Sequence, residues 1–138
     1  MNATAMALVG YIGWGITLVL GIAVQRTVVS LSRHRPINTF RVDGTDISPF
    51  GERLCRAHAN WYESFPALGG LLLLALATGN TAITETLAYV LLLSRIVQSS
   101  IHLYSTSLLA GLFRFSFFFV QIVIAVYWAL QFVARFTD

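Results

Sequence analysis

The feature that constrains this chain most is a polar block, residues 52–66, that runs directly into an apolar stretch, residues 67–78. A helix needs about 20 residues to cross a bilayer, so the apolar stretch alone is too short. A spanning helix must therefore include part of the block, which places Arg56, Asn60 and Glu63 at or below headgroup depth. A charge near the bilayer centre costs roughly 2.5–3.5 kcal/mol even on lenient scales. These side chains must pair with one another, with other helices or with a polar ligand.

The polar side chains of this block share one face of the predicted helix. At about 100° per residue they fall within an arc of roughly 100°. The face comprises Glu52, Arg53, Arg56, Asn60 and Glu63. A polar stripe of this kind on an otherwise apolar helix is where we expect function to lie.

The composition of the whole chain is typical of a membrane protein. Of its 138 residues, 57% are hydrophobic and 11% are charged, whereas soluble proteins carry about 25% charged residues. The length fits one domain. The nine basic residues other than histidine are all arginine, and their surplus over the acids lies near the predicted membrane boundary. It indicates a role in orienting the helices and in binding anions, and nucleic acid is an unfavoured partner. The single cysteine, Cys55, excludes an internal disulfide, and the sequence offers no metal-ligand cluster.

The hydropathy pattern predicts an all-α membrane protein built as a four-helix transmembrane bundle. The predicted helices cover about residues 5–34, 50–78, 82–104 and 111–136. Ser48 or Pro49 is predicted to begin the second helix, because both residues favour helix starts. The first helix contains small residues that let neighbouring helices approach closely in lipid. These are Gly10, Gly13, Gly15 and Gly21.

The distribution of arginine predicts how the helices are oriented. Four spans place both termini on one side of the membrane. Most arginines flank the first loop, and Arg114 flanks the third connection, whereas only Arg135 lies toward the other side. By the positive-inside rule, loops 33–50 and 105–111 are predicted to be cytoplasmic and both termini to face outward. The membrane would be the inner membrane in a bacterium and that of the endoplasmic reticulum in a eukaryote.

The third and fourth predicted helices also carry polar side chains at depth. The polar face of the third helix comprises Arg95, Gln98, Ser99 and His102. The fourth helix carries Arg114 in its first turn and Gln121 two turns later on the same side. We expect Arg26, Arg56 and Arg114 near the cytoplasmic end of the bundle and Arg95 deeper.

Two interpretations of these charges remain open from the residues alone. In the structural one, Glu63 pairs with Arg56 or Arg95 and holds the helices together. In the other, the arginines bind a ligand, because one buried glutamate cannot neutralise three or four of them. The surplus positive charge then calls for an anion with several carboxylates or phosphates.

The polar block resembles the signature of a known family. It reads ERLCRAHANWYESFP, which is similar to the pattern ER-x-x-RA-x-x-N-x-x-E-x-[FY]P of the membrane-associated proteins in eicosanoid and glutathione metabolism, abbreviated MAPEG. The block opens the second of four predicted helices, as it does in the family. The size of the chain and the positions of Arg95 and Arg114 extend the resemblance over its whole length.

The resemblance implies a homotrimer of four-helix protomers, with glutathione bound as co-substrate between protomers near the cytoplasmic face. Arg114 corresponds to the arginine that stabilises the thiolate, and a guanidinium lowers the pKa of a nearby thiol. The helix-one arginine corresponds to Arg26, or else to Arg33 or Arg35. The residues implied to hold glutathione are Arg26, Arg56, Asn60, Glu63, Arg95, Gln98 and His102.

The predicted function is that of an integral membrane glutathione transferase, extending to peroxidase activity, on an apolar substrate that enters from the bilayer. Active relatives usually have tyrosines where this chain has Gln98 and His102. That departure favours an alternative, a non-catalytic lipid-binding scaffold of the same fold. A small oligomeric transporter is a weaker third hypothesis, because the first and fourth helices lack the breaks that line transport sites.

Overall fold

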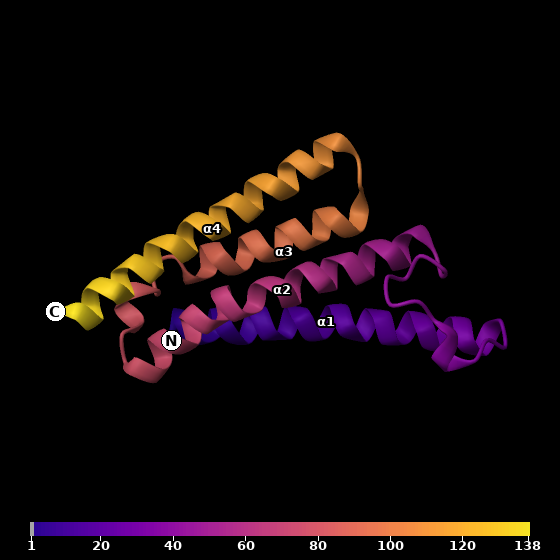
Figure 1. Cartoon of the computed structure of the whole chain (residues 1–138), viewed down its shortest axis with the longest axis horizontal. Coiled ribbons are helices and arrows are strands. Elements are labelled where there is room, and N and C mark those ends of the chain that lie inside the picture. The colour runs from indigo at the N-terminus through magenta and orange to yellow at the C-terminus, as the bar shows by residue number, and fades with distance from the viewer. Residues whose placement is uncertain (1) are drawn as a thin grey trace.

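The computed structural model describes residues 2–138 and is all-helical over this range, which confirms the predicted fold class. The helices are α1 (Ala3–Ser32), α2 (Pro49–Thr78), α3 (Ala88–Tyr104) and α4 (Leu108–Thr137), with the 3-10 helices η1 (Ile37–Thr39) and η2 (Thr81–Ile83). Both termini lie at one end of the bundle, here called the terminal end (Figure 1). The α1–α2 and α3–α4 connections lie at the other, the loop end (Figure 1).

Local chemistry sets both ends of α2. The Ser48 hydroxyl accepts a hydrogen bond from the Gly51 N–H at 2.9 Å, and Pro49 occupies the first turn, so the predicted start is confirmed. The helix ends at Gly79, whose φ of 70° is left-handed and favours glycine. Pro66 lies inside the helix, and the helix continues through it.

The third helix begins at Ala88, later than the predicted start near residue 82. The segment between α2 and α3 is instead held by contacts with α1. The Thr84 hydroxyl is 2.7 Å from that of Thr4, and the Glu85 carboxylate accepts a hydrogen bond from the Ala3 N–H at 3.3 Å. Threonine hydroxyls that bond outside the helix compete with helical structure, which explains the later start.

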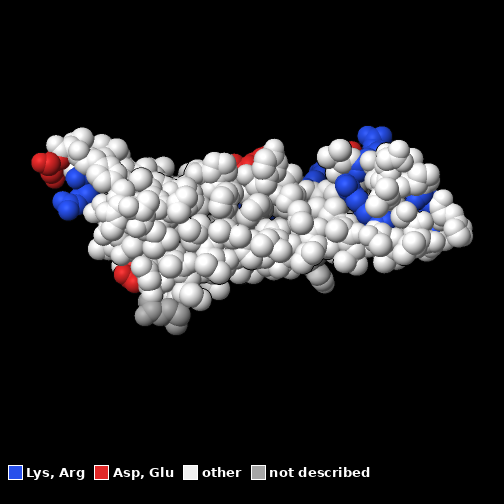
Figure 2. Space-filling model, turned by 90° about the horizontal axis from the view of Figure 1, so that it is seen from below, with Lys and Arg blue, Asp and Glu red and all other residues white. Residues whose placement is uncertain are grey.

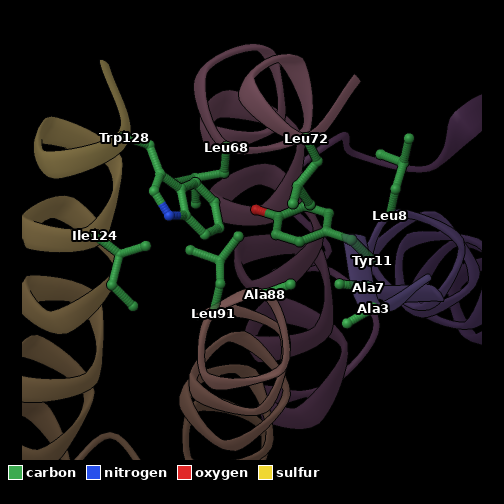
Figure 3. Packing of buried hydrophobic residues seen from close by; sticks show 10 residues of the cluster. All are labelled: Ala3, Ala7, Leu8, Tyr11, Leu68, Leu72, Ala88, Leu91, Ile124 and Trp128. Atoms are coloured by element: carbon green, nitrogen blue, oxygen red, sulfur yellow. The ribbon is translucent and has the colours of Figure 1, made fainter. Parts of the chain in front are cut away.

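The apolar core lies toward the terminal end and joins all four helices (Figure 3). Tyr11 of α1, Leu72 of α2, Leu91 of α3 and Trp128 of α4 are fully buried in it. Helices α1 and α4 are long and apolar enough to cross a membrane. Because lipid is as apolar as these side chains, the core stabilises the bundle mainly through close van der Waals packing.

Two glycines of α1 allow a matched test of this packing. A Cβ at Gly15 would lie 2.3 Å from the Trp61 ring, whose indole N–H donates to the Tyr11 carbonyl at 2.9 Å. A Cβ at Gly13 would meet nothing within 4 Å. Gly15→Ala is expected to lower the free energy of unfolding by about 1–3 kcal/mol. Gly13→Ala should be neutral or stabilise by about 0.5–1 kcal/mol. Denaturation of the purified protein in detergent, followed by circular dichroism, checks both, and equal midpoints would contradict the close approach.

The α1–α2 loop is organised by two aspartates outside the helices. Asp46 pairs with Arg35 and accepts a hydrogen bond from the Arg41 N–H at 3.1 Å. Burial alone would raise the pKa of Asp46, but the hydrogen bonds from Arg35 and Arg41 outweigh it and lower the pKa. The Thr45 hydroxyl and N–H lower the pKa of Asp43 in the same way.

These shifts predict a loop that loosens in acid. A carboxylate whose folded pKa is lowered stabilises the fold above its unfolded pKa of about 3.9, and this stabilisation is lost as the pH falls through the folded pKa. Protection of the Arg41 amide against hydrogen exchange, corrected for intrinsic rates, should therefore decline below about pH 4. Asp46→Asn should weaken it already at neutral pH. Protection that does not change with pH in the natural chain would count against this role.

Candidate functional site

Contacts with α1 show how deep each polar residue lies in the bundle. Counting from the terminal end, Thr84 lies beside Thr4, Trp61 packs at Gly15, and Leu54 packs at Gly21. The apolar part of α1 ends near residue 24. The α2 residues next to Trp61 therefore lie about halfway along the apolar part of α1, whereas those before Leu54 lie at its loop-end boundary.

At mid-depth, Arg95 of α3 is fully buried and is held by neutral partners. Its guanidinium donates to Asn60 Oδ1 and to Ser64 Oγ, each at 2.7 Å. Its Cζ lies 5.7 Å from the centroid of the Tyr11 ring, and the Tyr11 hydroxyl is 3.0 Å from Ser64 Oγ. Arg95 Nε has no hydrogen-bond partner among the described residues. Arg95 thus connects α3 to α1 and α2 without a counter-charge.

Two glutamines extend this network to α4. Gln98 Nε2 donates to Asn60 Oδ1 at 3.1 Å, and Gln98 Oε1 accepts from Gln121 Nε2 at 2.9 Å. Gln121 is fully buried. Both ends of the Gln98 amide are therefore used inside the protein. The amide nitrogen of Asn60 donates no hydrogen bond within residues 2–138, since Arg95 and Gln98 both bond to its oxygen.

The loop end carries most of the positive charge of the molecule (Figure 2). Arg56 pairs with Glu52 at 2.7 Å, and Arg53 Nε donates to the Leu103 carbonyl at 2.9 Å. The half-buried His102 lies within Coulombic range of Arg53, Arg56 and Arg114. We call these four residues, from α2, α3 and α4, the arginine cluster.

Arg114 is the member of the cluster with a buried donor that lacks an acceptor within residues 2–138. That donor is its Nε. A buried donor left without an acceptor costs about 1–3 kcal/mol, more when it is charged. An anionic group bound beside His102 would supply the missing acceptor, so the residues present fit a small acidic ligand.

A cavity of about 460 Å³ lies between α1 and α2 at the same end. Arg26 and Arg56 line it, together with apolar side chains such as Val19 and Ile22. Arg26 donates to the Arg41 carbonyl at 3.2 Å, and its Nε is buried without a partner in the described chain. Arg33 is exposed, and Arg35 is used by Asp46. Of the three candidates on or after α1, Arg26 is therefore the one that faces a cavity with a free donor.

Glu63 lies at mid-depth but does not pair with an arginine. The interpretation in which Glu63 binds Arg56 or Arg95 is wrong for the described chain, where Arg56 pairs with Glu52 and Arg95 with neutral oxygens. Glu63 is exposed instead and lines a cavity of about 280 Å³ with Asn60, next to α4. The side chain therefore lies on the α4 side of α2, a placement that the angular count alone could not reveal.

The predicted site residues thus divide into two groups. Arg95, Asn60 and Gln98 form the mid-depth network, whereas Arg26, Arg56, His102 and Arg114 gather at the loop end. Glu63 lies at the depth of the network but outside it. The sequence prediction missed the contributions of Tyr11 and Ser64 to the network. Ser64 follows Asn60 by one helical turn and offered a weak signal, but Tyr11 lies in an apolar helix and offered none.

Comparison with known proteins identifies the family. The model of the MAPEG family matches residues 4–134, nearly the whole chain. No curated protein and no solved structure matches it. The family is one of helical membrane proteins with roles in glutathione and lipid-mediator metabolism, and it accounts for a four-helix bundle with polar residues at membrane depth. The chain therefore belongs to the MAPEG family.

Proposed function

We propose that this protein is a membrane-embedded, glutathione-dependent transferase that acts on apolar, lipid-borne electrophiles. MAPEG proteins generally bind glutathione. The observation that carries the proposal is the buried, unpartnered Nε of Arg114 within the arginine cluster, where Glu52 is the one acidic residue among residues 2–138 that forms an ion pair with a cluster member. A guanidinium that lacks an acceptor in a water-poor place suits a bound thiolate or carboxylate.

The chemical groups of glutathione suit the side chains on both sides of Arg56. Arg26 and Arg56 would bind its carboxylates, since bidentate pairing with carboxylates is what guanidinium does best. The Glu63 carboxylate would accept a hydrogen bond from the amino group of glutathione. The amide nitrogen of Asn60 would donate to a peptide carbonyl oxygen. Arg95 and Gln98 would hold Asn60 in place. His102 would lie beside the thiol in the position where active relatives carry tyrosine.

Arg114 would make the nucleophile available at neutral pH. A positive charge beside a thiol favours the thiolate, which is the reactive form. The thiolate would attack an electrophilic carbon of the second substrate, forming a carbon–sulfur bond while the leaving group departs with its electron pair. With a lipid hydroperoxide, the thiolate would attack the terminal oxygen, forming a sulfur–oxygen bond while the O–O bond breaks and the lipid alkoxide leaves and takes up a proton. A second glutathione would then attack the oxidised sulfur, forming the disulfide and releasing water.

We further propose a homotrimer with glutathione between protomers. The exposed Glu63 carboxylate at mid-depth supports this, because a charge facing lipid at that level is costly unless another protomer covers it. The concentration of arginine at the loop end supports a cytoplasmic location for loops 33–50 and 105–111 and an outward location for both termini.

Calorimetric titration with glutathione separates this function from the scaffold alternative, which the internal use of the Gln98 amide favours. The natural chain should bind in the millimolar range or tighter. Arg56→Ala should weaken binding by about tenfold or more, the equivalent of a charged hydrogen bond. The exposed Arg33, replaced by alanine, is the matched control and should leave affinity unchanged. Absence of binding by the natural chain at millimolar glutathione would support the scaffold instead.

A further inference from the structure

A third cavity lies at the terminal end, opposite the arginine cluster. It measures about 580 Å³ and lies between α4 and the segment that precedes α3. Its apolar part includes Leu87, Val123 and Ile124, and its polar part includes Thr86, Tyr127 and Gln131. No residue of the proposed glutathione site lines it, so an inference drawn from it stands apart from the proposed function.

The wall of this cavity contains backbone outside regular α-helix. Residues 81–87 form a 3-10 helix and turns, and Thr84 lies beside Thr4 in the first turn of the apolar α1. Irregular backbone within a membrane occurs only where protein covers it or where it lines a polar space. Several N–H groups of this segment bond to carbonyls of residues 80–84, and the cavity beside it lies level with the first turn of α1, at the end of the apolar part of the bundle.

The face of α4 along the cavity changes character in regular steps. Val123, Tyr127 and Gln131 line the cavity, and Arg135 lies one turn beyond them; the four follow one another at intervals of four residues and are exposed. Going outward, the side chains are aliphatic, phenolic, amide and guanidinium. The steps cover about 18 Å at 1.5 Å per residue, which is about half of a bilayer core with part of its headgroup layer. This order matches the acyl chain, ester and phosphate of a phospholipid.

The charges at the terminal end, beyond the residues that line the cavity, restrict the headgroup. Arg135 Nε donates to Asn80 Oδ1 at 3.2 Å, which holds the guanidinium against the turn that leads into the cavity wall. Arg135 is the one arginine placed at this end in the described chain, where Glu85 and Asp138 supply carboxylates. Acidic and basic atoms accordingly appear together at the terminal end in Figure 2. The cation and the two carboxylates together suit a headgroup that carries both a negative and a positive charge.

We propose that this cavity binds one zwitterionic phospholipid. Its acyl chain lies against Val123 and Leu87, and its ester oxygens accept hydrogen bonds from Tyr127 and Gln131. The phosphate binds Arg135, and the ammonium group faces the carboxylates. The lipid thereby covers the irregular backbone before α3.

Native mass spectrometry of the purified full chain with defined lipids tests the site. With phosphatidylethanolamine, the natural chain should retain one lipid per protomer. Arg135→Ala should reduce occupancy by about tenfold, as expected for loss of a charged hydrogen bond. Val123→Trp, which fills the cavity, should abolish retention. Arg33→Ala, at the loop end, should bind as the natural chain does.

The same measurement can overturn the proposal in several ways. Equal retention by all variants would show that the lipid binds elsewhere. Stronger retention of phosphatidylglycerol, or equal retention of uncharged diacylglycerol, would refute recognition of both the phosphate and the ammonium group of the lipid. A changed oligomer mass in Val123→Trp with unchanged lipid would show that a second copy of the chain fills the cavity. Glutathione binding is expected to be normal in Arg135→Ala and Val123→Trp. A failure of the lipid-site proposal is therefore distinguishable from a failure of the proposed transferase function.

Discussion

Replacing Arg114 with alanine is expected to lower kcat/KM for glutathione conjugation by about 10²–10³-fold. The physical reason is that Arg114 alone in the arginine cluster has a buried nitrogen without an acceptor. Loss of one preorganised donor at a developing or bound anion has about this effect on rate. Arg56 and Arg53 already have protein partners, so they are poorly placed to replace it.

The experiment uses the detergent-solubilised protein, glutathione and a chloronitroarene electrophile. Arg114→Lys keeps the charge without the planar donor set and should recover part of the activity. Ultraviolet absorbance of the bound thiolate, recorded against pH, should show a higher thiol pKa in Arg114→Ala than in the natural chain. Arg33→Ala is the matched control. An alanine variant that keeps its assembly state and its full activity would refute the role of Arg114.

Replacing Arg95 with alanine is expected to destabilise the bundle by about 2–5 kcal/mol. The change leaves a cavity where a fully buried side chain stood. It also removes donors from Asn60 Oδ1 and Ser64 Oγ, and an unmade buried hydrogen bond costs about 1–3 kcal/mol. The substitution also removes a buried charge that has no acidic partner in the described chain, and this stabilises the fold. The expected loss is therefore smaller than the sum of the cavity and hydrogen-bond effects.

Unfolding midpoints in detergent measure this effect. Arg41→Ala is the control, because its side chain is 68% exposed in the α1–α2 loop, and it should change stability by less than about 0.5 kcal/mol. Combining Arg95→Ala with Asn60→Leu should give a coupling energy of about 0.5–3 kcal/mol, as expected for direct partners. Additive effects of the two substitutions would contradict the network.

Local chemistry allowed much of the fold to be predicted from the sequence. Ser48 and Pro49 specify the start of α2, and the left-handed Gly79 specifies its end. The start of α3 was not predictable in the same way, because the partner of Thr84 is Thr4, which lies 80 residues away in the chain. A hydroxyl pairing over such a separation leaves no local pattern.

For the candidate site, helical spacing correctly placed Arg95 and Gln98 on one face of α3. Spacing alone could not show that this face meets Asn60 and Gln121, since that depends on the rotation of neighbouring helices. The same limit explains the wrong pairing of Glu63. Charge suggested an arginine as its partner, whereas the rotation of α2 leaves it on the outer surface.

The uneven attachment of α4 has a mechanical consequence. Its half toward the C-terminus is fixed by Trp128 in the core, and Gln121 is tied to Gln98 at mid-depth. Before Gln121, the helix buries none of its residues fully, and Leu109 and Phe113 are more than half exposed. Segments with few buried contacts open at low free-energy cost. The amides of α4 before Gln121 are therefore expected to exchange their hydrogens faster than those around Trp128, while the unbroken helix keeps the two parts in line.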